Sequence, residues 1–164
     1  MDNFFSPGMS PLVLLAMVVV VVVIGSLLPL SPMEPMLVGI ALYAGSSLLV
    51  PLVVVAGISE VVAKSLIYAA GTQADRVLSQ KRRESMNRVR GYLTGNRLLR
   101  IAVIFGSALS GFPPFYVVTV AYGALRLPLR DYLVVGAIGR AGRHAVIITL
   151  SRGVAEAALP EFFR

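Results

Sequence analysis

The chain of 164 residues has no cysteine, and it has one histidine, His144. The absence of cysteine excludes disulfides, thiolate metal sites and a thiol nucleophile. A single imidazole cannot form the histidine cluster on which many other metal sites depend. We therefore expect no metal, no other cofactor and no catalytic residue, and the protein is not expected to be an enzyme.

Charged residues are scarce as well. They make up 14% of the chain, whereas 57% of the residues are hydrophobic and the mean hydropathy is +0.82. This composition is too apolar for a soluble domain of such length, and it predicts a multi-pass integral protein of the cell membrane. Because each crossing needs about 20 apolar residues, the chain has room for roughly four to six embedded segments. We expect them to form one domain, 1–164.

The net charge is nevertheless positive, at +7. In a soluble protein such a balance would indicate binding of nucleic acid. Here the basic residues concentrate in one connecting segment, which is typical of membrane topology and of contact with anionic headgroups. The expected partners are therefore membrane lipids and not nucleic acid.

The first apolar stretch, 11–30, is predicted to be a transmembrane helix. A signal peptide is the competing interpretation, but the residues before this stretch include Asp2 and no basic residue. No cleavage site with small residues follows the stretch either. We therefore expect an uncleaved helix.

The second apolar stretch, 36–71, is too long for one crossing. A helix of its roughly 36 residues would reach about 54 Å, whereas the hydrocarbon core is about 30 Å thick. Gly45, the two serines that follow it, and Pro51 interrupt the stretch. We therefore expect a re-entrant hairpin or a pair of short helices over 33–57, and then a helix over 58–72.

The segment 73–100 is strongly basic. The positive-inside rule predicts that such a short segment is a cytoplasmic loop. A specific site for lipid headgroups is the alternative interpretation. Its basic residues are Arg76, Lys81, Arg82, Arg83, Arg88, Arg90, Arg97 and Arg100, against Asp75 and Glu84.

Adjacent prolines interrupt the next apolar stretch, 101–125. Pro113 and Pro114 each lack a backbone donor, and Pro114 also moves Pro113 away from helical geometry. We therefore expect a second re-entrant hairpin over 101–125. A last transmembrane helix is predicted over 131–150.

The two halves thus share one plan, in which a broken apolar hairpin precedes a helix. Paired interrupted segments are typical of transporters built from inverted repeats, with the site at the breaks. The sequence predicts an all-α polytopic membrane protein with an inverted repeat of two re-entrant hairpins, each followed by a transmembrane helix, plus an N-terminal transmembrane helix. The hairpin backbone is expected to depend on Pro32, Pro35, Gly111, Pro113 and Pro114.

Glu34 is the most isolated charge of the chain, because uncharged residues extend from Asn3 to Met33 and from Pro35 to Ser59. A charge placed near hydrocarbon costs roughly 2.5 to 3.5 kcal/mol on insertion scales. Such residues usually lie where a polar group is handled. We therefore expect Glu34 to lie on a substrate or proton pathway.

Three polar residues share one face of the helix predicted over 58–72. Glu60, Lys64 and Tyr68 follow one another at intervals of four, and glutamate before lysine is the favourable order for a helical ion pair. One interpretation is a pair that only neutralises itself near the interface. The other places all three residues on the substrate or proton pathway.

The last predicted helix carries two arginines, Arg140 and Arg143, on one face. Guanidinium groups bind phosphate with bidentate hydrogen bonds, so this pair is a candidate phosphate site. The alternative is that both side chains extend to the lipid headgroups. His144 follows directly, and without an orienting partner it is more often a structural histidine than a catalyst.

An intramembrane protease is the alternative enzyme class. Ser107 or Ser110 with His144 would form a serine-histidine dyad of the rhomboid type. The rhomboid Gly-x-Ser-Gly pattern is absent, because Ala108 and Leu109 precede Ser110 and Gly111. A motif without its structural context remains a hypothesis, and we expect no protease.

Four short motifs follow one another over most of residues 28–148. They are LPLSPMEPMLVG at 28–39, KSLIYAAG at 64–71, residues 107–115 followed by Ala121-Tyr122-Gly123, and Gly139-Arg140 in the last helix. In this order they resemble the DedA family, also called the VTT or SNARE-associated Golgi protein superfamily. The first resembles its proline-glutamate hairpin and the second its tyrosine-x-x-glycine helix.

The resemblance implies two re-entrant hairpins that meet in the membrane, and transport of a lipid as the activity. In bacterial members the implied cargo is an anionic phospholipid or a polyprenyl phosphate such as undecaprenyl phosphate, moved with proton coupling. Glu34 matches the glutamate of the family's first hairpin. The chain departs from the bacterial pattern at the second hairpin, which lacks arginines, and at Ser46 and Ser47, where that pattern has an acidic residue.

Two other functions fit the same residues. One is a membrane scaffold whose basic loop binds anionic lipid or a partner. The other is an exporter of small solutes or ions with the same fold. Association into an oligomer is compatible with each of them.

Overall fold

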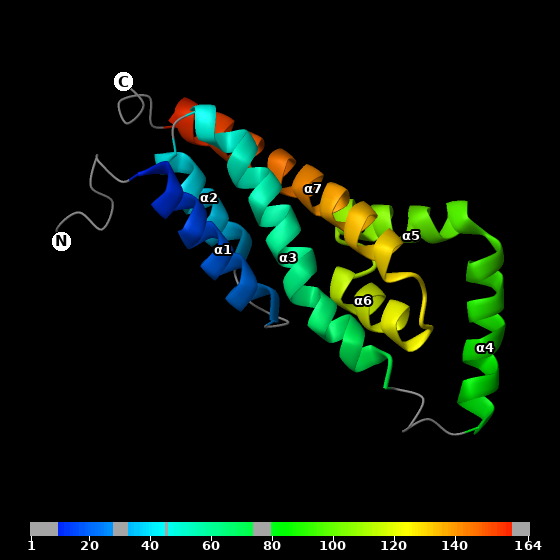
Figure 1. Cartoon of the computed structure of the whole chain (residues 1–164). Coiled ribbons are helices and arrows are strands. Elements are labelled where there is room, and N and C mark those ends of the chain that lie inside the picture. The colour runs from blue at the N-terminus through cyan, green and yellow to red at the C-terminus, as the bar shows by residue number, and fades with distance from the viewer. Residues whose placement is uncertain (1–9, 28–32, 45, 74–79, 159–164) are drawn as a thin grey trace.

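The computed structural model describes residues 10–27, 33–44, 46–73 and 80–158. These residues form seven α-helices and one short 3₁₀ helix, and they contain no strand (Figure 1). The predicted all-α class is confirmed. The helices are α1 (Pro11–Leu27), α2 (Met33–Tyr43), η1 (Ser46–Leu48), α3 (Leu49–Gly71), α4 (Gln80–Gly95), α5 (Arg97–Ser110), α6 (Phe115–Ala124) and α7 (Leu129–Ala158).

The predicted boundary at residues 57 and 58 is wrong. The chain turns at residues 44–48, and α3 then continues without a break to Gly71. Pro51 lies in the first turn of α3, where its missing N–H removes no intrahelical hydrogen bond, so it does not interrupt the helix. Pro35 likewise lies in the first turn of α2 and does not interrupt that helix.

Two helical segments are long and apolar enough to cross a membrane, 46–71 and 129–155. The second is longer than the predicted span 131–150, because α7 begins at Leu129 and ends at Ala158. Shorter apolar helices occupy 11–27, 33–42 and 115–124. The predicted loop 73–100 contains α4 and the first turn of α5.

α3 and α7 pack along each other and form the centre of the fold (Figure 1). α1 packs on α3, and α5 packs on α7. Each of the two short helices packs on a central helix from the other half of the chain, since α2 contacts α7 and α6 contacts α3. The buried side chains form two apolar clusters. One lies among α1, α2 and the first half of α3 and includes Ile148 of α7, and the other lies among α5, α6 and the first turns of α7 and includes Val61 of α3.

Glycines allow the closest approaches between these helices. A Cβ atom on Gly57 would lie 2.7 Å from the Ala141 nitrogen of α7. A Cβ atom on Gly71 would lie 2.7 Å from the Val120 oxygen of α6. These contacts bring α3 close enough to α7 and α6 for polar side chains to meet between them.

Candidate functional site

Glu60 lies at the centre of a buried charged cluster between α3 and α7. Its side chain is fully buried, and it accepts hydrogen bonds from Lys64 through Oε1 and from Arg140 Nε through Oε2, the latter at 2.6 Å. The Nε2 atom of His144 lies 3.1 Å from the same Oε2. We call these four residues the Glu60 cluster.

Helical spacing explains this arrangement. Glu60 and Lys64 are one turn apart on α3, and Arg140 and His144 are one turn apart on α7, so each pair faces the other helix. The close approach of Gly57 to Ala141 holds the two helices together directly beside the cluster. A buried carboxylate is stable here because its oxygens receive charged and polar partners.

An aromatic ring covers the two cations of the cluster. The Phe115 ring centroid lies 5.6 Å from Lys64 Nζ and 5.6 Å from Arg140 Cζ. Cation–π contacts of this length are favourable, and more so when water is excluded. Phe115 in turn stacks on Tyr132 with 5.7 Å between the centroids. The first turn of α6 therefore closes one side of the cluster.

Glu34 forms a second and more accessible pair. Arg143 Nε donates to Glu34 Oε1 at 2.7 Å, and Arg143 Nη1 donates to the Ser110 oxygen at the end of α5 at 2.9 Å. The side chains of Arg143 and Glu34 are 24% and 33% exposed, whereas that of Glu60 is inaccessible. Arg143 thus joins α2, α7 and the break between α5 and α6.

Gly111 makes room for this contact. Its φ of +80° is unfavourable for a residue with a side chain, and an added Cβ atom would lie 2.7 Å from Arg143 Nη1. The chain then passes Pro113 and Pro114 before α6 begins at Phe115. The interruption therefore falls in the segment where the adjacent prolines predicted one.

A Gly111→Ala variant should be less stable by about 1–2 kcal/mol, because alanine pays the cost of the left-handed conformation. Thermal unfolding in detergent, followed by circular dichroism, would measure the change. Gly39→Ala is the matched control, since nothing lies within 4 Å of its added Cβ atom and its φ is ordinary. Equal effects of the two variants would contradict this account of Gly111.

Five of the predicted site residues meet in these two groups. Glu60, Lys64 and Arg140 belong to the Glu60 cluster, and Glu34 and Arg143 form the second pair. Arg140 and Arg143 do not share one partner, as a single phosphate grip requires, because each binds its own carboxylate.

Tyr68 lies apart from both groups. Its hydroxyl donates to the Leu127 oxygen at 2.5 Å, and its ring stacks on Tyr132. It therefore joins α3 to the turn before α7 and belongs to neither charged group. Pro32, the other predicted hairpin residue, lies outside the described residues.

The serine-histidine dyad is not formed. Ser107 and Ser110 donate their hydroxyls to backbone oxygens, among them Pro113 O at 2.6 Å, and His144 faces Glu60. Sequence reasoning treated His144 as structural and missed its place in the charged cluster. Its position four residues after Arg140 was the available signal, since it places both side chains on one face of α7.

The two groups together carry an excess of positive charge. Two carboxylates, Glu34 and Glu60, face three basic side chains, Lys64, Arg140 and Arg143, which leaves one positive charge if His144 is neutral. Arg140 also acts electrostatically on Glu34, which links the two groups. This site suits an anion, and no group of three or more acidic or histidine ligands for a metal occurs among the described residues.

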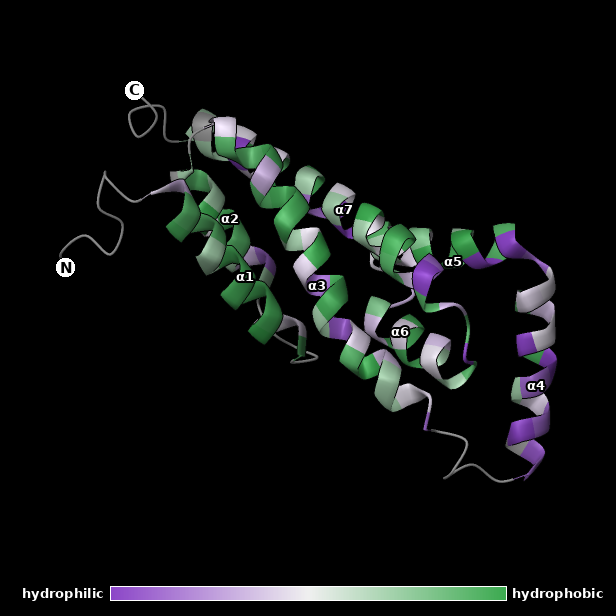
Figure 2. Ribbon diagram, viewed as in Figure 1, coloured by the Kyte–Doolittle hydropathy of each residue, from purple (hydrophilic) through white to green (hydrophobic). Residues whose placement is uncertain are grey.

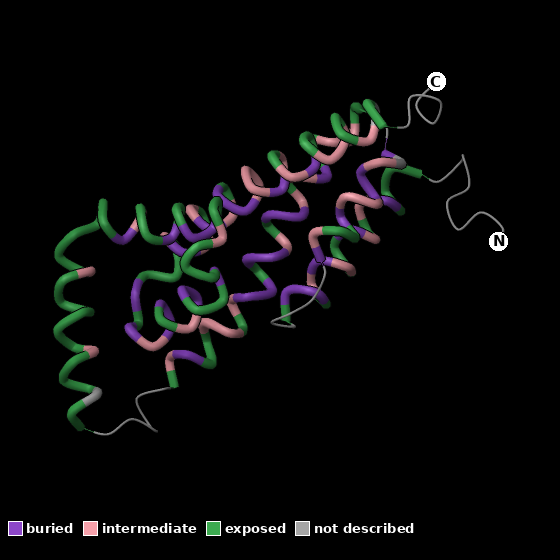
Figure 3. Tube along the Cα trace, turned by 180° about the vertical axis from the view of Figure 1, so that it is seen from behind, coloured by how far each residue is buried: buried purple, intermediate pink, exposed green. Residues whose placement is uncertain are grey.

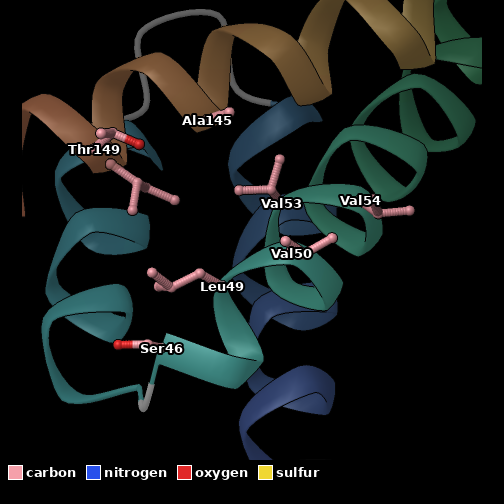
Figure 4. Close-up of a pocket in the computed structure, with 8 residues that line it drawn as sticks. Ser46, Leu49, Val50, Val53, Val54, Ala145 and Thr149 are labelled. Carbon is pink, nitrogen blue, oxygen red and sulfur yellow. The ribbon is translucent and has the colours of Figure 1, made fainter.

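An apolar hollow of about 400 Å³ lies apart from the charged residues. It opens between the first turns of α3, with Leu49, Val50 and Val53, and the second half of α7, with Ala145 and Thr149 (Figure 4). No charged side chain lines it. Its lining is mostly apolar, with Ser46 and Thr149 as the polar residues.

Comparison of the chain with protein families, curated proteins and solved structures finds no match.

Proposed function

We propose that this chain is a multi-pass membrane transporter or scramblase of DedA type that moves a lipid with an anionic headgroup. The observation that carries the proposal is the pair of coupled charged groups, with an excess of one positive charge, enclosed by apolar helices. Ionisable residues inside a membrane are costly and usually mark a transport pathway. The resemblance of residues 28–148 to the DedA family supports the same function.

The packing of the helices supports an inverted repeat. The order of a longer helix, a short apolar helix and a long helix occurs twice, as α1–α2–α3 and as α5–α6–α7. Within each half the first helix packs on the last, α1 on α3 and α5 on α7, and between the halves each short helix packs on the other long helix, α2 on α7 and α6 on α3. Transporters with such repeats bind their cargo between the halves, which is where Glu34 and Glu60 lie.

In the proposed mechanism the headgroup exchanges with Glu34 on Arg143. Arg143 is the accessible cation of the site. A guanidinium can form the same pair of parallel hydrogen bonds with a phosphate as with a carboxylate. A proton on Glu34 removes the competing charge, so the headgroup binds, and deprotonation lets Glu34 displace it. Arg140 stays bonded to the buried Glu60 and supplies a fixed positive field.

Glu34→Gln should slow lipid movement by roughly ten- to a hundred-fold, which corresponds to the loss of one charge-assisted hydrogen bond. Proteoliposomes with a headgroup-labelled anionic lipid would measure the rate, with and without a proton gradient. Glu84→Gln makes the same change of charge on the exposed surface of α4 and should have little effect. Equal rates for wild type and Glu34→Gln, under both conditions, would refute the role of Glu34.

The same assay separates the other two functions. A scaffold would show no lipid movement in any variant, and its effect in cells would depend on the basic residues of α4. An exporter would move a small solute or ion and leave the labelled lipid in place.

A further inference from the structure

α4 is the least covered helix of the fold. It extends away from the packed helices and is hydrophilic along most of its length (Figure 2). Among its described side chains only Met86 and Leu93 are partly buried, and they pack against the apolar cluster of α5, α6 and α7. The rest of α4 is exposed along most of its length (Figure 3). Nearly the whole circumference of this 16-residue helix is therefore accessible.

The basic residues around α4 gather at one end of the molecule. Arg126, from the turn after α6, and Arg130, at the start of α7, are both exposed. They lie at this same end because the ion pair between Arg100 and Asp131 holds the start of α7 beside the start of α5. The exposed basic side chains of α4 and α5 are Lys81, Arg83, Arg88, Arg90 and Arg97. We call these seven residues the basic end.

Arg100 fixes the direction of α4. Its Nε and Nη2 atoms donate to Asp131 Oδ2 at 3.0 and 2.6 Å, and its Nη1 donates to the Leu93 oxygen in the last turn of α4 at 3.3 Å. Its own backbone oxygen accepts a hydrogen bond from Tyr122 at 2.7 Å. Because Arg100 is buried, this contact joins α4 to α5, α6 and α7 and makes α4 a positioned element.

We infer that α4 is an interfacial helix that binds the anionic headgroups of the bilayer surface. The inference rests on the membrane placement in the proposed function, but not on transport. Basic side chains beside membrane spans are attracted to anionic lipid. Val89 and Tyr92 are 48% and 73% exposed, and apolar and aromatic side chains of this kind lie favourably at headgroup depth. Charge complementarity and the position of the basic end at the ends of the spans favour lipid over a soluble acidic partner.

The cysteine-free chain allows a direct test with one label. An environment-sensitive fluorophore on Asn87→Cys would report on α4 in the full-length protein, in nanodiscs of zwitterionic lipid with or without anionic phospholipid. We expect a blue shift with anionic lipid only, lost in high salt. Gln at positions 81, 83, 88 and 90 should weaken the association roughly five-fold per residue, whereas Lys at the three arginines should retain it.

Three outcomes would overturn the inference. They are the same label spectrum in both lipids, an unchanged shift in the Gln variant, and a shift caused only by an added acidic protein or nucleic acid. Glu34→Gln should leave the shift unchanged, so a failure of the transport proposal would be distinguished from a failure of this one. Arg100→Gln should keep the shift but broaden the distance distribution between spin labels on Asn87→Cys and Val134→Cys; an unchanged distribution would refute the positioning role.

Discussion

A Glu60→Gln variant should lose about 3–5 kcal/mol of folding free energy, because it leaves buried cations without their carboxylate. Lys64 and Arg140 both bind Glu60, and both are largely inaccessible. Glutamine keeps the size of the side chain, so the loss reflects charge and not a cavity. The chain has no tryptophan, and circular dichroism in detergent is therefore a suitable measure of unfolding.

Two variants control this experiment. Glu60→Gln with Lys64→Met removes one of the stranded cations and should recover part of the stability. Glu84→Gln, on the exposed surface of α4, should change the stability by less than about 0.5 kcal/mol. If Glu60→Gln unfolds at the same temperature as Glu84→Gln, the Glu60 cluster does not hold α3 and α7 together as described.

A Gly123→Ala variant should be destabilised by about 3 kcal/mol, at the upper end for overpacking. An added Cβ atom on Gly123 would overlap the Tyr68 oxygen and lie 3.1 Å from Gly71 Cα. Both neighbours are backbone atoms, so no side-chain rotation relieves the overlap, and α6 must move away from α3. Thermal unfolding in detergent is the measurement here as well.

Gly106→Ala is the matched control for this prediction. Gly106 lies in the middle of α5, is exposed, and has nothing within 4 Å of its added Cβ atom. Alanine there should be neutral or stabilising by about 0.5–1 kcal/mol, because it restricts the unfolded chain. A Gly123→Ala protein as stable as Gly106→Ala would show that α3 and α6 are not in close contact.

The division of labour between Arg140 and Arg143 follows from their different burial. Arg140 is 7% exposed at its side chain and is held by the inaccessible Glu60, whereas Arg143 is 24% exposed and is held by Glu34. Only the second pair can exchange partners without leaving a buried charge unpaired. Variants of Glu34 should therefore affect the proposed transport, and variants of Glu60 should affect folding.

The local features of the fold could be predicted from the sequence. Adjacent prolines inside an apolar stretch interrupt a helix, so the break before Phe115 was predictable. The spacing of Glu60 and Lys64 likewise predicts their contact on any helix. The boundary predicted at residue 57 is wrong, because only the turn at residues 44–48 interrupts the apolar stretch and Pro51 does not. A proline in the first turn of a helix costs nothing, and only the start of α3 at Leu49 reveals that position.

Composition and periodicity thus specify the helices, the apolar character and the presence of unusual charges. The partners of those charges depend on tertiary structure, since Arg140 binds Glu60 across 80 residues and Arg143 binds Glu34 across 109. Which arginine meets which carboxylate follows from the close approach of α3 to α7 at Gly57 and from the position of α2 beside α7. Packing between distant segments decides these contacts, and no local pattern along the chain encodes them.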